Sequence, residues 1–122
     1  MPGPRKKILV LCRRAPYSGH LARAGLDAAL AAAVFEQDLS VLFMDEGVWQ
    51  LVPGKQSGEI DNKSISSTLE SMPLYDIESF FVEALSLQQR GIAAEALNHN
   101  TITLGAAELP AFIDSFDQVW SF

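Results

Sequence analysis

Cysteine and histidine are scarce in this sequence, and their scarcity removes several classes of function. Cys12 is the one cysteine among 122 residues, which excludes an intramolecular disulfide, a CxxC redox pair and a cysteine-rich zinc site. The two histidines, His20 and His99, lie 79 positions apart, and no group of residues has the spacing of metal ligands. The glycine-rich phosphate-binding patterns GxGxxG and GxxxxGK[ST] are also missing. We therefore expect no metal and no cofactor.

Basic residues and long apolar runs are few as well. Nine Lys and Arg against fifteen Asp and Glu leave a net charge of −6 and a pI near 4.7, which argues against direct binding to nucleic acid or to an anionic membrane. The apolar run at residues 8–12 is too short for a signal peptide. No stretch approaches the roughly 20 apolar residues of a membrane span. We expect a cytoplasmic protein.

The apolar pattern predicts one α/β domain over residues 1–122. Residues 8–12 are apolar without alternation, which is typical of a strand covered on both faces in a parallel sheet. Strands that alternate with helices favour parallel pairing, so we predict a five-stranded, mostly parallel sheet with helices on both faces. The predicted strands are residues 8–12, 39–44, 77–82, 101–104 and 118–122. The predicted helices are residues 21–35, 64–72, 83–90 and 108–115, with a short helical turn at 48–51.

In such sheets ligands gather at the carboxyl ends of the strands, which directs attention to four short segments. Arg13 and Arg14 either bind an anion or are solvated rim charges. Asp45 and Glu46 either form an acid/base pair or serve locally, with Asp45 as the cap of the helical turn that follows. The segments are Cys12–Arg14, Asp45–Glu46, Glu83–Ala84 and Gly105–Ala106.

Cys12 has two interpretations. The adjacent arginines could lower the pKa of its thiol and make it a nucleophile or a persulfide carrier. Alternatively, it is a small apolar residue at the end of a buried strand, where free cysteine commonly occurs. The sequence favours the second interpretation, and no catalytic residue is assigned from the pattern.

Large aromatic side chains form a different signal. Trp120 and Phe122 share one side of the last predicted strand, where chain ends are usually polar. Together with Trp49 and Tyr75, they are candidates for a subunit interface. The alternative is that these four residues cover the core of their own domain.

Short segments in a fixed order run through nearly the whole chain and carry a family resemblance. They are residues 7–8, 15–16, 25–28, 45–48, 50–51, 53–55, 74–78, 86–87 and 90–91. This ordered set resembles the TusC/DsrF branch of the DsrE-like sulfur-relay family.

The resemblance implies a flavodoxin-like three-layer fold and a protein that works in a complex. In that family, TusB, TusC and TusD form a heterohexamer that passes persulfide sulfur from TusA to TusE, on the way to 2-thiouridine at the tRNA wobble position. DsrEFH complexes serve dissimilatory sulfur oxidation instead. The resemblance therefore implies TusB-like and TusD-like sister subunits, with either task open.

One residue departs from the pattern of the carrier subunits in that family. The carrier cysteine follows the third strand there, and the matching position here is Glu83. A glutamate holds no sulfane sulfur. The resemblance therefore implies a non-catalytic subunit, with a stand-alone carrier that uses Cys12 as the alternative.

Overall fold

The computed structural model describes residues 6–16, 20–35, 37–52, 60–77, 80–97 and 100–122. Strands and helices alternate along these ranges, with three 3-10 helices (η) between them. The elements are β1 (Lys7–Cys12), α1 (Leu21–Val34), β2 (Asp38–Phe43), η1 (Asp45–Leu51), α2 (Ile60–Ser71), η2 (Met72–Tyr75), β3 (Phe80–Glu83), α3 (Ala84–Gln89), η3 (Ala94–Ala96), β4 (Thr101–Leu104), α4 (Leu109–Asp114) and β5 (Gln118–Ser121).

The five strands form one sheet in the order β4-β3-β2-β1-β5. Every neighbouring pair is parallel, as the continuous apolar run of the first strand predicts. Strand order runs outward from β1 to β4, and β5 then lies on the other side of β1. The boundary between β1 and β5 is therefore the point where strand order reverses, and β4 and β5 are the edge strands.

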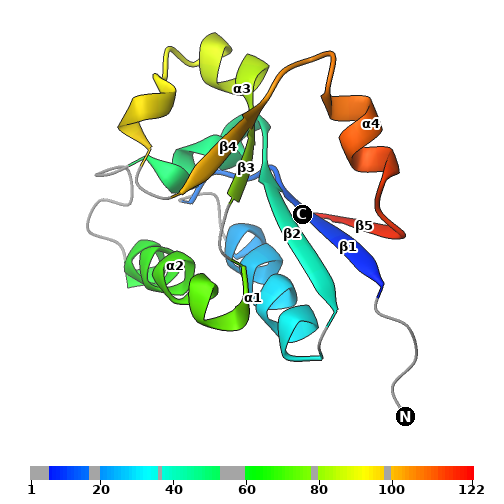
Figure 1. Ribbon diagram of the computed structural model, residues 1–122. Coiled ribbons are helices and arrows are strands. Elements are labelled where there is room, and N and C mark those ends of the chain that lie inside the picture. Colours follow the sequence, from blue (N-terminus) through cyan, green and yellow to red (C-terminus); the bar gives the residue numbers. More distant parts are fainter. Residues whose placement is uncertain (1–5, 17–19, 36, 53–59, 78–79, 98–99) are drawn as a thin grey trace.

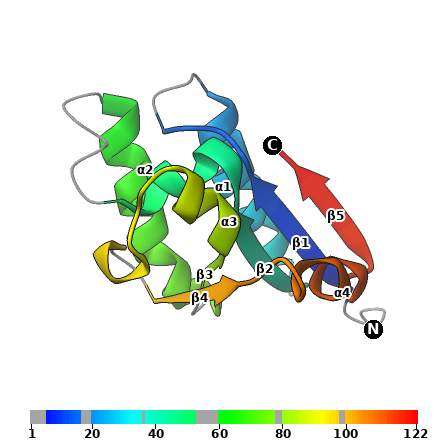
Figure 2. The same ribbon diagram turned by 90° about the horizontal axis from the view of Figure 1, so that it is seen from above.

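Helices cover both faces of the sheet, and the strand residues alternate between two apolar clusters. Val10 and Phe43 belong to the larger cluster, together with residues of α1 and α2, whereas Leu9 and Leu42 belong to the smaller one, together with residues of α4. In Figure 1, α1 and α2 lie below the sheet and α4 lies above it. Figure 2 shows α1 and α2 on one side of the sheet and α4 on the other. This three-layer arrangement confirms the predicted flavodoxin-like class.

Helix α1 packs closely on the sheet because its inward face is small. Ala22, Ala29 and Ala32 are buried beside Leu26, and each lacks the bulk that would hold the helix away. A Cβ atom at Gly25 would lie 3.2 Å from the Cβ of Phe122. The glycine therefore lets α1 approach the residue that follows β5.

Three predicted elements begin three or four residues away from the observed start, and the other ends agree to within one residue. The helical turn predicted at residues 48–51 is η1, which begins at Asp45. Helix α2 begins at Ile60 rather than at residue 64. Strand β3 begins at Phe80 rather than at residue 77, because η2 ends in a left-handed turn at Asp76 (φ 68°). The amide of Ile77 then donates to the Met72 carbonyl at 3.2 Å, so it closes the helix end instead of joining the sheet.

Candidate functional site

The parallel strands bring their carboxyl ends to one edge of the sheet, as expected. β1 ends at Cys12, β2 at Phe43 and β3 at Glu83. The backbone ladder between β1 and the end of β5 continues past the strands, because the Arg13 amide donates to the Phe122 carbonyl at 2.9 Å. Charged residues that follow β1 and β2 are therefore held beside the end of β5.

A close backbone contact sets the position of η1 on this edge. The Met44 amide donates to the Cys12 carbonyl at 3.1 Å, and an added Cβ at Gly47 would lie only 1.9 Å from that same oxygen. Glycine is required here because any side chain would overlap the backbone of β1. Val48 and Leu51 of η1 are fully buried, so the contact anchors the whole segment.

Polar side chains form a connected network over the ends of β1, β2 and β3. Arg13 Nε lies 2.9 Å from Asp45 Oδ2, with about half of each side chain exposed. The Asp45 amide donates to Ser86 Oγ at 2.8 Å, and Ser86 Oγ donates to Glu83 Oε1. The network therefore joins Arg13, Asp45, Ser86 and Glu83 across three strands.

A second ion pair extends the network. Arg90 Nε lies 2.6 Å from Glu46 Oε2, and Arg90 NH1 donates to the Ser86 carbonyl at 3.1 Å. Neither Ser86 nor Arg90 was predicted as a site residue. Their four-residue spacing places Arg90, which follows α3, on the same side as Ser86, but nothing in the sequence indicates that this side faces Asp45 and Glu46.

The expectation that Asp45 caps the helical turn is wrong. Met44 holds the N-cap position of η1, no side chain caps that end, and the Asp45 carboxylate bonds Arg13 instead. Asp45 also adopts a positive φ of 52°, a conformation in which aspartate is several-fold enriched among non-glycine residues. With each carboxylate paired to a different arginine, Asp45 and Glu46 do not converge as an acid/base pair.

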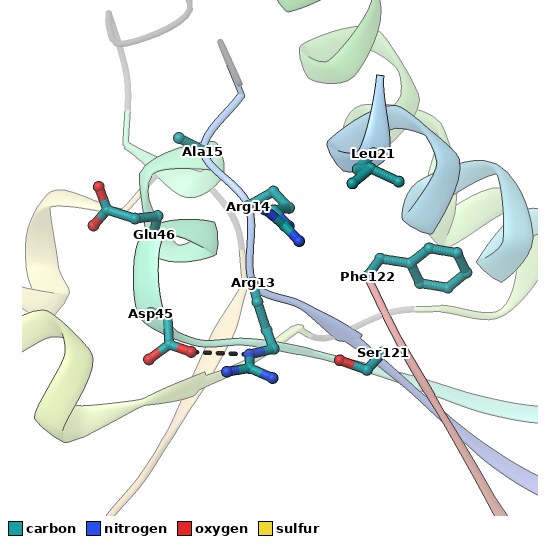
Figure 3. A pocket seen from close by; sticks show the side chains of 8 residues that line it. All are labelled: Arg13, Arg14, Ala15, Leu21, Asp45, Glu46, Ser121 and Phe122. Carbon is teal, nitrogen blue, oxygen red and sulfur yellow. Dashed lines mark hydrogen bonds and ion pairs between the residues drawn. The ribbon is translucent and has the colours of Figure 1, made fainter. Parts of the chain in front are cut away.

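A pocket of about 630 Å³ opens beside this network, between the ends of β1 and β5 and the start of α1. Figure 3 shows the Arg14 side chain extending into the space bordered by Arg13, Leu21 and Phe122. The lining residues are Arg13, Arg14, Ala15, Leu21, Asp45, Glu46, Ser121 and Phe122. The pocket therefore lies where strand order reverses, the place where open α/β sheets usually bind ligands.

Cys12 does not line this pocket. Its side chain is 1% exposed and belongs to the larger apolar cluster under α1. Burial raises the pKa of its thiol from 9.0 to about 12, because an apolar interior disfavours the thiolate. The arginines that follow Cys12 in the chain extend into solvent, so they do not offset this effect.

The other sequence-predicted residues are dispersed. Glu83 is half-buried at the end of β3, within the network but outside the pocket lining. The Gly105 amide bonds Glu108 Oε1 at 3.0 Å, so the Gly105–Ala106 segment begins the turn into α4. His20 is exposed at the N-cap of α1, and His99 lies outside the described residues.

The four aromatic candidates lie in different environments. Trp120 and Phe122 are half-buried and pack against the larger apolar cluster of their own chain. Trp49 is half-buried in η1. Tyr75 is 43% exposed and lines a second, smaller pocket near the end of α1. Trp120 and Phe122 therefore cover the core of their own domain in part, whereas Tyr75 is exposed.

Among the described residues, no group of three or more His, Cys, Asp or Glu is arranged to hold a metal ion. None of the described helices has both the length and the apolar character needed to cross a membrane.

Comparison with known proteins identifies the family of this chain. Residues 6–122 match the DsrE/DsrF-like family. The chain belongs to the DsrE/DsrF-like family. Relatives within it include proteins named TusC homolog from Pseudomonas aeruginosa, 33% identical over 93% of this chain and 96% of theirs, and from Vibrio vulnificus, 36% identical over 95% and 98%.

Two further comparisons concern a named relative and a solved structure. The intracellular sulfur oxidation protein DsrF of Allochromatium vinosum is 37% identical over 75% of this chain and 68% of its own length. The crystal structure of the YchN protein from E. coli superposes with a TM-score of 0.80 and 24% identity, over 98% of this chain and all of that one. The second likeness concerns the fold alone.

Proposed function

We propose that this chain is a non-catalytic subunit of a TusBCD-type sulfur-relay complex. The complex passes persulfide sulfur from TusA to TusE in the cytoplasm, for synthesis of 2-thiouridine at the wobble position of tRNA. Full-length similarity supports the TusC assignment, because relatives named TusC homolog align with 93–95% of this chain. The relative named DsrF aligns with 75%. A DsrF-type role in a DsrEFH complex is the second candidate.

The environment of the Cys12 thiol and the presence of Glu83 support the non-catalytic part of the proposal. A persulfide carrier needs a thiolate that its partners can reach, whereas the Cys12 thiol is 1% exposed and its pKa is raised to about 12. The family resemblance implies that Glu83 stands at the position of the carrier cysteine, and this glutamate accepts a hydrogen bond from Ser86. Both points favour a chain that supports sulfur transfer by a sister subunit over a stand-alone carrier that uses Cys12.

Exposed apolar side chains support a role within an assembly. Phe35, which follows α1, is 75% exposed, and Leu74 of η2 is 84% exposed. Helix α1 and η2 contact each other. Exposed apolar patches often mark protein–protein contacts. TusB-like and TusD-like sister subunits in a heterohexamer are the proposed partners, and Tyr75 and Trp49 remain candidates for the interface.

Co-expression with the products of the neighbouring genes tests the assembly. Native mass spectrometry is expected to show a complex of this chain with two related subunits, in equal copies. A chain that remains monomeric or forms only homo-oligomers would contradict the proposal.

Sulfur transfer in the reconstituted complex tests the role of Cys12. Cys12→Ala is expected to leave the rate of persulfide transfer to TusE unchanged, because no sulfur resides on this chain. Replacing the carrier cysteine of the TusD-like subunit in the same complex is the matched control, and it should abolish transfer. A loss of transfer in a folded Cys12→Ala complex would assign the carrier role to Cys12.

A further inference from the structure

The pocket between β1, β5 and η1 has no role in the function proposed above. We propose that it binds a singly charged anionic group carried on an apolar stem, and that Arg14 is the cation that recognises the charge. Three features support this proposal: the ion pairs of the charged lining residues, the hydrogen bonds that hold the backbone at Arg13 and Arg14, and the apolar wall opposite Arg14.

Ion pairing among the described residues leaves Arg14 as the lining cation that is not engaged. Asp45 and Glu46 are the two carboxylates in the pocket lining, and they are paired with Arg13 and Arg90 respectively. Arg14 forms no ion pair with any residue that the structure describes. Its guanidinium can therefore form a charge-assisted hydrogen bond with an anion that enters the pocket.

The main chain that carries Arg14 is held in place without using its side chain. Gln50, which is 1% exposed, donates from Nε2 to the Arg14 carbonyl at 2.9 Å. On the other side, the Arg13 amide bonds the Phe122 carbonyl. The Arg13 guanidinium lies beside Asp45, to which its Nε donates (Figure 3). The backbone at Arg13 and Arg14 is therefore fixed before a ligand binds, which lowers the entropic cost of binding.

The wall opposite the arginines is apolar. Leu21 is 43% exposed, and it lies next to Phe122 across from Arg14 (Figure 3). A volume of about 630 Å³ falls within the range of small-ligand sites. One guanidinium beside an apolar wall suits a single charge on an apolar stem better than a free polyanion, which would leave Leu21 and Phe122 in contact with charge.

Two sources offer this chemistry. One is a small carboxylic acid with an aliphatic or aromatic body. The other is the persulfide anion of a partner's cysteine, whose terminal sulfur carries one charge beside an apolar disulfide stem. The second source rests on the proposed function, because only a relay complex brings a persulfide to this edge of the sheet. The anion site itself does not rest on it.

Binding of hexanoate, with 1-hexanol as the uncharged probe, tests the site on the chain alone. The Arg14 Nε–Hε signal is followed by NMR during titration of the ¹⁵N-labelled protein. We expect hexanoate to shift this signal and hexanol to leave it in place. Arg14→Gln should weaken hexanoate binding about tenfold or more, as expected for loss of a charge-assisted hydrogen bond.

Arg23→Gln is the matched control for the change in net charge, because Arg23 is paired with Asp27 on α1 and does not line the pocket. It should change hexanoate binding less than twofold, and Arg14→Lys should retain most of the affinity. Equal shifts with hexanol, or equal losses in Arg14→Gln and Arg23→Gln, would overturn the anion site.

The reconstituted relay separates the two sources. If the pocket receives a persulfide, Arg14→Gln should slow sulfur transfer about tenfold while the complex assembles normally. Unchanged transfer together with lost hexanoate binding would support the small carboxylic acid and reject the persulfide. If no relay complex forms, the proposed function fails, and the hexanoate titration still decides the anion site.

Discussion

Replacing Gly47 with alanine tests whether the edge of the sheet depends on the close approach of η1 to β1. The new Cβ would lie 1.9 Å from the Cys12 carbonyl oxygen, 2.6 Å from its carbon and 3.1 Å from the Arg13 nitrogen. All three are backbone atoms in or next to the central strand, so they have no rotamer with which to avoid the overlap. The η1 segment has to move away by more than 1 Å.

The expected cost follows from what that movement disturbs. Overpacking of a well-packed site costs about 1–3 kcal/mol, and loss of the hydrogen bond from Met44 to Cys12 adds about 1 kcal/mol. Val48 and Leu51 are fully buried on the same segment, so little of the strain can be relieved. We expect Gly47→Ala to lower the free energy of unfolding by about 3 kcal/mol, and Tm by about 10 °C for a domain of this size.

Urea unfolding followed by tryptophan fluorescence, together with calorimetry, measures this change. Gly105→Ala is the matched control, because a Cβ there would meet only the flexible end of Glu108, at 3.3 Å, and should cost under about 0.5 kcal/mol. A Gly47→Ala protein within about 1 kcal/mol of this control would refute the close approach. The site geometry derived from it would then fall as well.

Three further predictions concern single side chains. In the native protein the Cys12 thiol should not react with a disulfide reagent at pH 8, and because its pKa is raised to about 12, stability should fall as pH rises from about 9 to 12. Cys12→Ala should remove that part of the pH dependence in urea unfolding, because the unfolded thiol ionises first. Ser86→Ala should lower the free energy of unfolding by about 1–3 kcal/mol, since it leaves the partly buried amide of Asp45 without its acceptor. The exposed Ser115→Ala is the control in the same assay, and it should cost under about 0.5 kcal/mol. At Asp76, where φ is 68°, valine should lower the free energy of unfolding by about 1–2 kcal/mol and glycine should be neutral or stabilising, as measured by thermal unfolding.

Local patterns in the sequence were sufficient for the elements and for the direction of the sheet. The unbroken apolar run at residues 8–12 predicted a central parallel strand, and β1 has β2 and β5 on its two sides. Residues 101–104 alternate between polar and apolar side chains, a pattern typical of a strand near an edge, and β4 is an edge strand. The predicted start of β3 is three residues too early. A left-handed turn at Asp76 ends η2, and the Ile77 amide then donates to the Met72 carbonyl, a hydrogen bond that the apolar pattern does not indicate.

The candidate site could be predicted only in part. Parallel topology alone placed Arg13, Arg14, Asp45 and Glu83 at one edge. The ion pairs could not be predicted, because they join positions 32 to 44 residues apart, Arg13 with Asp45 and Arg90 with Glu46.

Periodicity, composition and short ordered segments were enough to predict the α/β class, the alternation of strands and helices, the edge where a ligand would lie, and the family that this chain resembles. These are local properties of a chain. Three features became known only from the packed fold. Cys12 faces the apolar layer under α1, Asp45 is bound to Arg13 instead of capping η1, and Arg14 forms no ion pair with a described residue. Burial and charge pairing depend on which distant segments meet, and that is fixed only when the sheet and its helices have packed.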